Sequence, residues 1–358
     1  MITSFRRLDW VLIGMLALLA AASTVSLSSF APELAVPQVV WFVIGFALIV
    51  AGSQLNWRWI GTQPWFRYGL YWFSVALLIA THLQGTVIRG TKSWLVLGPL
   101  QFQPAELAKL ALIIVLAGFF SKRHIEASRG KNIVTSFAYL AIPFALTVAH
   151  PDLGSAAIMV VIWCGFILMS GVDKKRLLIG AVCAIAIAVV LWVSVLEGYQ
   201  KNRIIGFIFS ERDPLGVNYN VLQSKIAIGS AGLFGKGFRA GTQTQLHFLP
   251  EAQSDFLFAA FVEEWGLVGG FVVLLTFLVV VYRLMRIGLR ARDNYSRFVV
   301  LGGGLFFLIH FFINTGSAVG LIPVAGITFP FFSYGGSNVL TSSALLSIIQ
   351  HIQLESST

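Results

Sequence analysis

Charged residues are scarce in this chain. Only 11% of its 358 residues are Asp, Glu, Lys or Arg, whereas a soluble domain usually carries about 25%. Hydrophobic residues make up 57%, and the mean hydropathy is +0.83. Apolar runs close to the length needed to cross a bilayer recur along the sequence. The composition therefore excludes a mainly soluble protein and predicts an all-α polytopic membrane protein with one transmembrane domain over residues 1–358.

Cysteine is nearly absent, with Cys164 and Cys183 alone. Both fall within predicted spans without a surrounding set of cysteines or histidines, which excludes a disulfide framework and a thiolate metal site. A phosphate-binding loop is also missing, because Gly235-Lys236 is followed by Gly237 where Ser or Thr is required. No internal repeat stands out, which weighs against a transporter built from duplicated halves.

The apolar runs predict about ten transmembrane helices. They cover residues 10–30, 36–54, 64–84, 102–121, 133–149, 152–172, 176–196, 256–284, 298–321 and 333–352. Arg6-Arg7 precedes the first run as in a signal peptide, but the length of that run and the spans after it indicate a retained helix. A large extracytoplasmic loop is predicted at 197–255, between spans seven and eight.

Basic residues are distributed unequally between the two sides of these spans. Of the 25 Lys and Arg residues, 16 fall on the side of the termini, 8 fall on the other side, and Lys109 lies inside a span. The positive-inside rule then predicts that both termini are cytoplasmic. This topology accounts for most of the net charge of +10 without a nucleic-acid partner. Six of the 8 outer basic residues lie on the long loop, where an anionic substrate is one explanation for them.

A polar segment runs directly into an apolar one at Ser254-Asp255. If the following span crosses a bilayer, Asp255 sits at its water-facing mouth, with Glu263 and Glu264 roughly two helical turns further in. A carboxylate held where water meets lipid can remove a proton from the hydroxyl of a lipid-borne substrate. Alternatively, Ser254 or Asp255 caps the N-terminus of the helix, since both residue types are good caps. Spacing alone leaves both interpretations open.

Other ionisable residues also fall at or inside predicted spans. Glu106 and Lys109 are three positions apart and share a helical face, so they can pair, either to pin the bundle or to line a polar cavity. Asp152 stands at the start of a span, where it can cap the helix or act in a site. His82 and His310 have no partner set in the sequence and are interpreted as packing or cavity-lining residues.

Two further stretches are predicted to lie outside regular spans. Val217, Val221, Leu222 and Ile226 share a helical face, which predicts a helix on the membrane surface or over the cavity. The glycine-rich stretch after it, with its basic residues, could hold a pyrophosphate, or those residues are plain membrane-surface charges. Nearer the C-terminus, the density of Pro and Gly in 314–338 predicts a loop or re-entrant element.

Together these stretches resemble one family of membrane proteins. LPEAQSDFLFAAFVEEWG, at 249–266, is similar to LPEAHTDFIFAVIAEELG, the signature of the SEDS family (shape, elongation, division and sporulation). FQPAELAKL at 102–110, PDLG at 151–154, QSKIAIGSAGLFGKG in the long loop and SYGGS at 333–337 also agree, so the resemblance covers nearly the whole chain. The loop fits the RodA branch, which serves cell elongation, better than the FtsW branch, which serves division. Departures near the C-terminus alter shape more than charge: Ala325, Thr328, Phe329 and Asn338.

The resemblance implies a glycosyltransferase of the bacterial inner membrane that polymerises lipid II into peptidoglycan and releases undecaprenyl pyrophosphate. Asp255 would be the general base. Residues expected to bind substrate or line the cavity are Glu106, Lys109, Asp152, Glu251, Glu263 and Ser333. Candidates for holding the pyrophosphate are Arg89, Lys92, Arg203, Arg212 and Lys225. A divalent cation, Mg²⁺ or Mn²⁺, is expected with them, although the sequence offers no protein ligand set for it.

The resemblance also implies a partner, because the chain has no soluble module that could cross-link peptides. A class B penicillin-binding protein, which is a single-span transpeptidase, is expected within the elongation machinery. Two other functions stay open. A lipid II flippase would need an ionisable path, which Glu106, Lys109, Glu263 and Glu264 could form. A non-catalytic scaffold would tolerate the loss of Asp255.

Overall fold

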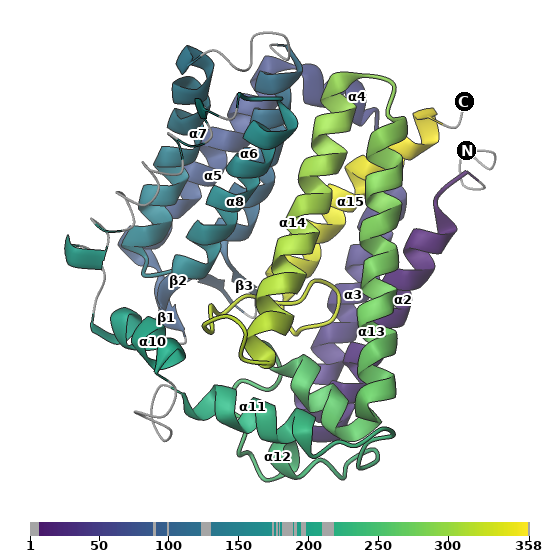
Figure 1. The fold of residues 1–358 in the computed structure, drawn as a ribbon. Coiled ribbons are helices and arrows are strands. Elements are labelled where there is room, and N and C mark those ends of the chain that lie inside the picture. Colours follow the sequence, from purple (N-terminus) through teal and green to yellow (C-terminus); the bar gives the residue numbers. More distant parts are fainter. Residues whose placement is uncertain are drawn as a thin grey trace.

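The computed structural model describes residues 7–88, 91–98, 100–122, 130–173, 198–209 and 218–356, and some positions between 174 and 197. Long helices stand side by side in one bundle (Figure 1). They are α2 Trp10–Phe30, α3 Pro32–Gly52, α5 Pro64–Gln84, α6 Pro104–Ser121, α7 Gly130–Ala149, α8 Leu153–Met169, α13 Leu257–Arg290, α14 Asn294–Ala318 and α15 Gly336–Ser356. The shorter helices are α4 Trp57–Thr62, α10 Gly198–Ile208, α11 Tyr219–Gly229 and α12 Thr242–Gln245.

Helices occupy nine of the ten predicted spans, so the predicted all-α membrane class is confirmed. By length and composition, six of the described helices can cross a membrane, namely α2, α3, α6, α7, α13 and α14. α8 is equally apolar but shorter, while α5 and α15 stand in the same bundle and carry more polar residues. The predicted seventh span, 176–196, falls largely outside the described residues.

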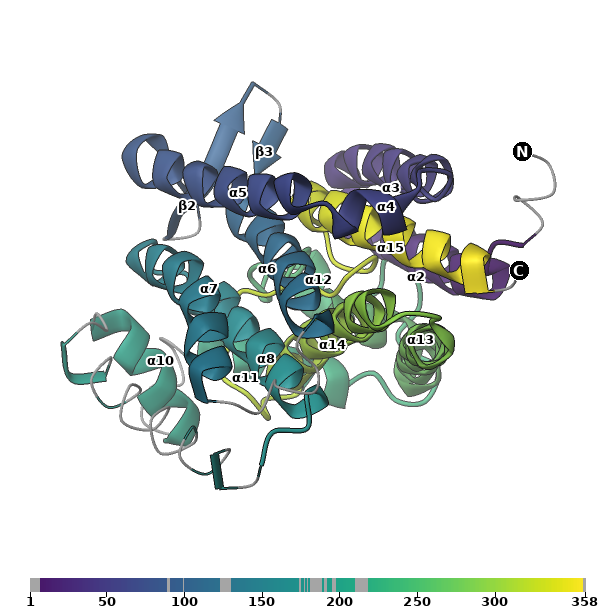
Figure 2. The same ribbon diagram turned by 90° about the horizontal axis from the view of Figure 1, so that it is seen from above.

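The most enclosed long helix is α6. Of its 18 residues all but Leu107 and Ser121 are buried, and seen from above it lies among α5, α7, α8, α14 and α15 (Figure 2). A helix that is apolar on every side belongs at the centre of a bundle. Glu106 and Lys109 are therefore held where water cannot solvate them, and each charge needs a partner from the protein.

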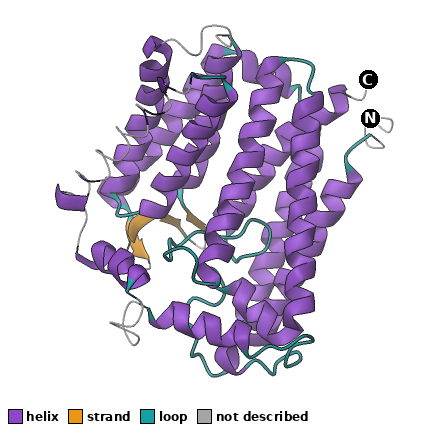
Figure 3. Ribbon diagram, in the orientation of Figure 1, coloured by secondary structure: helices purple, strands orange, loops and turns teal. Residues whose placement is uncertain are grey.

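A small antiparallel sheet, which was not predicted from the sequence, leads from α5 to α6. β1 Thr86–Ile88 pairs with β2 Thr91–Leu97, and β2 pairs with β3 Leu100–Phe102. Gly98, with φ +61°, begins the turn between the last two strands, a backbone conformation that glycine adopts without strain. The sheet lies toward the end of the bundle opposite the termini (Figure 3).

Both termini lie at one end of the bundle, and α10, α11 and α12 lie at the other, which we call the outer end (Figure 1). The helix predicted in the long loop is confirmed as α11. Ser224 and Ala227 of α11 are buried against the bundle, whereas Leu222 and Ile226 are each 41% exposed. An apolar face turned away from the protein is what a helix lying on a membrane surface requires.

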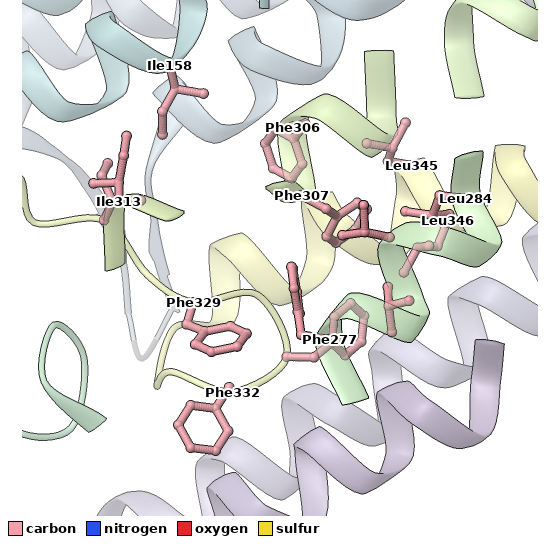
Figure 4. Close-up of a cluster of buried hydrophobic side chains, with 14 of the residues drawn as sticks. Ile158, Phe277, Leu284, Phe306, Phe307, Ile313, Phe329, Phe332, Leu345 and Leu346 are labelled. Carbon is pink, nitrogen blue, oxygen red and sulfur yellow. The ribbon is translucent and has the colours of Figure 1, made fainter. Parts of the chain in front are cut away.

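Aromatic rings anchor the loop between α14 and α15, residues 319–335, in the core. Phe329 packs against Phe277 of α13, and Phe332 lies beside Phe329 (Figure 4). The ring centroids of Phe277 and Phe329 are 4.9 Å apart at an interplanar angle of 90°, and those of Phe329 and Phe332 are 5.1 Å apart. Edge-to-face pairs of this kind are favourable beyond the area they bury. These ring contacts fix the loop to the core of the bundle.

The predicted orientation can be tested by labelling. In the chain freed of its own cysteines, a cysteine replacing the exposed Arg239 should react with a membrane-impermeant maleimide from outside intact cells, because it lies at the outer end. A cysteine replacing Arg292, between α13 and α14 at the opposite end, should react only after permeabilisation. The reverse pattern would contradict cytoplasmic termini.

Candidate active site

Asp255 lies in the turn that leads into α13, at the outer end of the bundle. The N-cap residue of α13 is Phe256, and no side-chain capping hydrogen bond is made there. Asp255 therefore stands one position before the N-cap of α13. The carboxylate is partly exposed, and its Oδ2 lies 4.0 Å from where a Cβ on Gly326 would stand. It thus faces the α14–α15 loop, and Asp255 as a residue is neither fully buried nor fully exposed.

Glu251 shapes the turn that carries Asp255. Its backbone has φ +53°, and its carbonyl oxygen accepts hydrogen bonds from the amides of Ser254 at 3.2 Å and Asp255 at 3.1 Å. Its carboxylate accepts from Gln253 Nε2 at 3.3 Å and from Ser254 Oγ at 3.4 Å. These bonds close the turn on itself, so Glu251 acts as a positioning residue for Asp255.

Two polar side chains fasten this turn to the α14–α15 loop. Asn314 Nδ2 donates to the carbonyl oxygen of Asp255 at 3.2 Å and to that of Ile327 at 2.8 Å. Ser333 Oγ donates to the carbonyl oxygen of Ser254 at 2.5 Å and accepts from the amide of Phe329 at 3.0 Å. Ser333 was predicted to line the cavity, but it is buried between the two segments and holds them together.

Asp152 lies across the same loop. Its Oδ1 accepts from the amide of Ser155 at 3.0 Å and caps α8, and its Oδ2 accepts from Gln103 Nε2 at 2.8 Å. Two residues further on, a Cβ on Gly154 would collide with the carbonyl oxygen of Ala325, so the start of α8 packs directly against the loop. Asp152 is confirmed as a cap, and it also joins the starts of α6 and α8 beneath the site.

His150 and His82 meet beside this cap, with ring centroids 5.6 Å apart. Burial, and secondly the neighbouring His82, lower the pKa of His150, while Asp152 acts in the opposite direction. His150 is therefore a neutral imidazole at neutral pH. His82 was interpreted as a packing or cavity-lining residue without partners, whereas in the structure its ring lies beside that of His150.

The predicted pyrophosphate-binding residues are only partly within the described structure. Lys92 Nζ donates to the carbonyl oxygen of His82 at 2.9 Å, at the end of α5. Lys225 is exposed on α11, and its side chain lies against Gly320 just beyond α14. Lys92 and Lys225 thus lie at the same end of the bundle as Asp255. Arg203 belongs to α10, whereas Arg89 and Arg212 fall outside the described residues.

A second polar cluster lies within the bundle. Lys109 Nζ is 2.7 Å from Glu106 Oε1, with side-chain exposures of 0% and 5%. Asn338 Nδ2 of α15 donates to Glu106 Oε2 at 3.2 Å, and His310 Nε2 of α14 lies 3.0 Å from Lys109 Nζ. Because His310 Nδ1 lies 2.8 Å from the carbonyl oxygen of Phe306, it carries the proton and leaves Nε2 to accept from Lys109. The pair predicted in α6 is confirmed, and it joins three helices.

The sequence analysis missed several of these polar partners. His310 was interpreted as a packing or cavity-lining residue without partners, but its Nε2 contacts Lys109, which is 201 positions away in the sequence. Asn314, Gln103 and Asn338 were not singled out. One signal was available, since His310 and Asn314 are polar residues inside an apolar span, where unpaired polar groups are costly.

Glu263 belongs to neither cluster. Its Oε1 lies 2.7 Å from Lys236 Nζ and accepts from the amide of Gln243 at 3.0 Å and from Thr242 Oγ1 at 3.1 Å. The neighbouring Glu264 instead accepts from Ser29 Oγ of α2. The prediction that Glu263 lines the substrate cavity is not supported by these contacts, because it holds the glycine-rich loop. The four groups of the flippase alternative thus form separate clusters in the described structure.

The glycine-rich loop is built into a break in α13. Gly266 has φ +73° and ψ −179°, and the helix is interrupted there. The amides of residues 267–268 donate to the carbonyl oxygens of 232–233, and those of 236–237 donate to 263–264, at 2.9–3.1 Å. A Cβ on Gly235 or on Gly266 would collide with the backbone of the other segment. Glycine is required at both positions by close approach and by positive φ.

A protein-held metal ion finds no support in the described part of the chain. There, no three His, Cys, Asp or Glu side chains converge so that they could hold a metal ion. The polar side chains around Asp255 instead form hydrogen bonds with one another and with the backbone of the turn and of the α14–α15 loop.

Fold and site together define a polytopic helical membrane protein with a partly exposed carboxylate at one end of its bundle, beside a non-helical loop. The chain belongs to the family of cell cycle proteins that groups FtsW, RodA and SpoVE, which matches residues 3–358. This confirms the resemblance drawn from the sequence motifs.

Curated relatives of the chain include enzymes. It is 34% identical over 346 residues to the peptidoglycan glycosyltransferase MrdB of Escherichia coli K12, covering 96% of this chain and 92% of that protein. It is 34% identical over 302 residues to the probable peptidoglycan glycosyltransferase FtsW of Haemophilus influenzae, covering 83% of this chain and 76% of that protein. The match to MrdB thus extends over nearly the whole of both chains.

Solved structures share the fold. A chain in a structure of a peptidoglycan synthase complex, described as coordinating polymerization and crosslinking, superposes with a TM-score of 0.82 at 31% identity, covering 98% of both chains. The rod shape determining protein RodA of Thermus thermophilus superposes with a TM-score of 0.72 at 28% identity, covering 97% of this chain and 96% of that one.

The buried pair in α6 yields a test of folding. Glu106→Ala or Lys109→Ala leaves an uncompensated charge in the bundle, which costs about 3–5 kcal/mol. We expect either variant to yield less folded, monodisperse protein and little activity, and the double variant to yield more folded protein than either single one. The measurement is the monodisperse fraction after detergent extraction.

Arg58→Ala is the control for this test. Arg58 pairs with Asp293 at 3.3 Å, but its side chain is 44% exposed, and exposed pairs contribute little. Its loss should leave folding nearly unchanged. Equal folding and full activity in all the α6 variants would show that neither folding nor activity depends on the pair.

Proposed function

We propose that Asp255 is the general base of this peptidoglycan glycosyltransferase and that its substrate is lipid II. One observation carries the proposal: Asp255 is a partly exposed carboxylate at the outer end, and it does not occupy the N-cap of the helix it precedes. Glu251, Asn314 and Ser333 fix the turn that presents it. A general base needs such a fixed position, because its contribution to the reaction rate depends on being within hydrogen-bond distance of the proton that it removes.

The proposed step forms one glycosidic bond. The acceptor sugar's hydroxyl oxygen attacks the anomeric carbon of the donor lipid II while its proton passes to the Asp255 carboxylate. The bond between that carbon and the pyrophosphate oxygen breaks, and undecaprenyl pyrophosphate leaves with the electron pair. Asp255 then returns the proton to solvent.

The leaving pyrophosphate needs positive charge, and the outer end can supply it. Lys92 and Lys225 lie there in the described structure, and we propose that Arg89, Arg203 and Arg212 join them. A divalent cation, Mg²⁺ or Mn²⁺, would arrive with the pyrophosphate, since Mg²⁺ is commonly held by substrate phosphates plus one or two carboxylates. Glu106, Lys109 and Asp152 support the fold beneath the site through their buried contacts.

We place this multi-pass protein in the bacterial inner membrane with both termini cytoplasmic, following the distribution of its basic residues. Asp255 then lies on the side where lipid II is polymerised. A non-catalytic scaffold or a flippase would not need a base at this position.

Replacing Asp255 by Asn separates the base from a structural role. The amide keeps the size and polarity of the side chain but cannot take up a proton. We expect Asp255→Asn to fold, reach the membrane and lose about 10²–10⁴-fold in polymerisation rate. The measurement is the glycan formed from purified lipid II by the purified protein with its partner. Asp255→Glu should also be strongly impaired, because the added methylene shifts the carboxylate.

Asp293→Asn is the matched control. Asp293 is the N-cap of α14 and accepts from the amide of Ser296 at 3.0 Å, and Asn caps a helix about as well as Asp. This variant should polymerise nearly normally. Glu251→Gln, which alters the turn but keeps a hydrogen-bonding side chain, should lose less activity than Asp255→Asn. Near-normal polymerisation by Asp255→Asn would refute the assignment.

We also propose that the chain works with a class B penicillin-binding protein in the elongation machinery. The similar chain of known structure comes from a complex that combines polymerization and crosslinking. We expect co-purification of such a transpeptidase in mild detergent and faster polymerisation by the complex than by the chain alone. Failure to co-purify, with undiminished activity of the lone chain, would count against the partner.

A further inference from the structure

A pocket of about 90 Å³ lies at the end of the bundle opposite Asp255. It is lined by Asp9, Arg283, Arg286, Ile287, Arg290 and Gln353. These residues come from three chain segments, the N-cap of α2, the last two turns of α13 and the end of α15. Those helix ends lie together near both termini (Figures 1 and 2). The pocket is thus a gap between helices at the boundary of the apolar spans.

An ion pair and hydrogen bonds made by Asp9 hold the walls of the pocket in place. Asp9 is buried, and its Oδ2 lies 2.7 Å from Arg283 Nη2 and 2.8 Å from Arg283 Nε. Its Oδ1 caps α2 by accepting from the amide of Leu12 at 3.0 Å, and its own amide donates to Gln350 Oε1 of α15 at 3.0 Å. Asp9 therefore ties α2 to both α13 and α15.

The charge of the pocket is not balanced. Arg283 and Asp9 neutralise each other, whereas Arg286 and Arg290 are exposed and make no ion pair within the described residues. They stand four positions apart on one face of α13, where like charges repel. An anion between them would relieve this repulsion, and guanidinium groups match phosphate oxygens well. The pocket thus presents two uncompensated guanidinium groups to a ligand.

The adjacent face of α13 is apolar. Tyr282, Met285 and Leu289 are exposed by 59%, 50% and 68%, within a helix apolar enough to span a membrane. In a bilayer this face meets lipid acyl chains. Met285 and Leu289 immediately precede Arg286 and Arg290 in the helix, so the acyl chains lie beside the arginines. A ligand that fills both places has an anionic head and apolar tails.

We propose that this pocket binds the phosphodiester headgroup of an anionic membrane phospholipid, with Arg286 and Arg290 on the phosphates and acyl chains along Met285 and Leu289. Basic pockets between helices at a membrane boundary recognise such headgroups. Two free guanidinium groups favour a headgroup with two phosphates, so cardiolipin should bind more tightly than phosphatidylglycerol. The site is separate from the proposed substrate site, because the two lie at opposite ends of α13, with residues 267–290, a rise of roughly 36 Å, between the break at Gly266 and the end of the helix.

The test is lipid binding by the full chain in neutral detergent, measured by native mass spectrometry with cardiolipin, phosphatidylglycerol and phosphatidylcholine. We expect affinities in that order. The double variant Arg286→Gln/Arg290→Gln should lose at least about tenfold in cardiolipin affinity. Its melting temperature without lipid should stay unchanged, because both side chains are exposed and the contact of Asp9 with Arg283 is kept.

Lys131→Gln/Arg292→Gln is the matched control. It removes two exposed positive charges at the same end of the bundle, outside the pocket, and should change cardiolipin affinity by less than about twofold. An equal loss in both double variants would mean diffuse attraction to basic residues and would overturn the proposal. Phosphatidylcholine binding as strong as that of cardiolipin would overturn it too. Stabilisation by millimolar inorganic phosphate equal to that by cardiolipin would show a site for free phosphate and refute the lipid assignment.

Discussion

A chain segment that is not helical must find partners for its backbone polar groups when it lies inside a membrane protein. The α14–α15 loop meets this constraint through a few amide and hydroxyl side chains. Gln38 of α3 donates to the carbonyl oxygen of Ser333 and accepts from the amide of Gly335, each at 3.3 Å. Asn314 and Ser333 supply the remaining bonds described above. Asn314 and Ser333 also donate hydrogen bonds to the turn before α13. The position of Asp255 therefore depends on the hydrogen bonds that hold this loop.

Two of the buried ionic groups are paired locally. Lys109 is neutralised by Glu106 within one helical turn, with Asn338 and His310 completing the hydrogen bonds. Glu263 is neutralised by Lys236 from a loop that fills the break in α13. Each set joins elements distant in sequence, so removing one member affects the packing of several helices. This is how a bundle made mainly of apolar side chains specifies one arrangement.

Most of the helices could be predicted, because a bilayer requires long apolar runs and these stand out in composition. The non-helical character of residues 319–335 was also predictable from Pro and Gly. The strand Thr91–Leu97 was missed, since a short run of this kind has no periodicity that separates strand from connector. The start of α13 at Phe256, one residue after Asp255, was not predictable, because sequence patterns do not resolve helix ends to a single residue. Partners such as Lys109 and His310 are set by tertiary packing, and no local pattern records them.

The interruption of α13 at Gly266 also determines how deep the residues before it lie in the membrane. The part of α13 after it, residues 267–290, is about 24 residues long and rises roughly 36 Å, enough to cross a hydrocarbon layer of about 30 Å by itself. The preceding segment then stands in the headgroup region, where the partly exposed Lys236 pairs with the buried Glu263. The pyrophosphate of a polyprenyl-linked sugar lies in this same layer. Asp255 would therefore meet the bond to be broken at headgroup height, while the polyprenyl chain stays in the hydrocarbon.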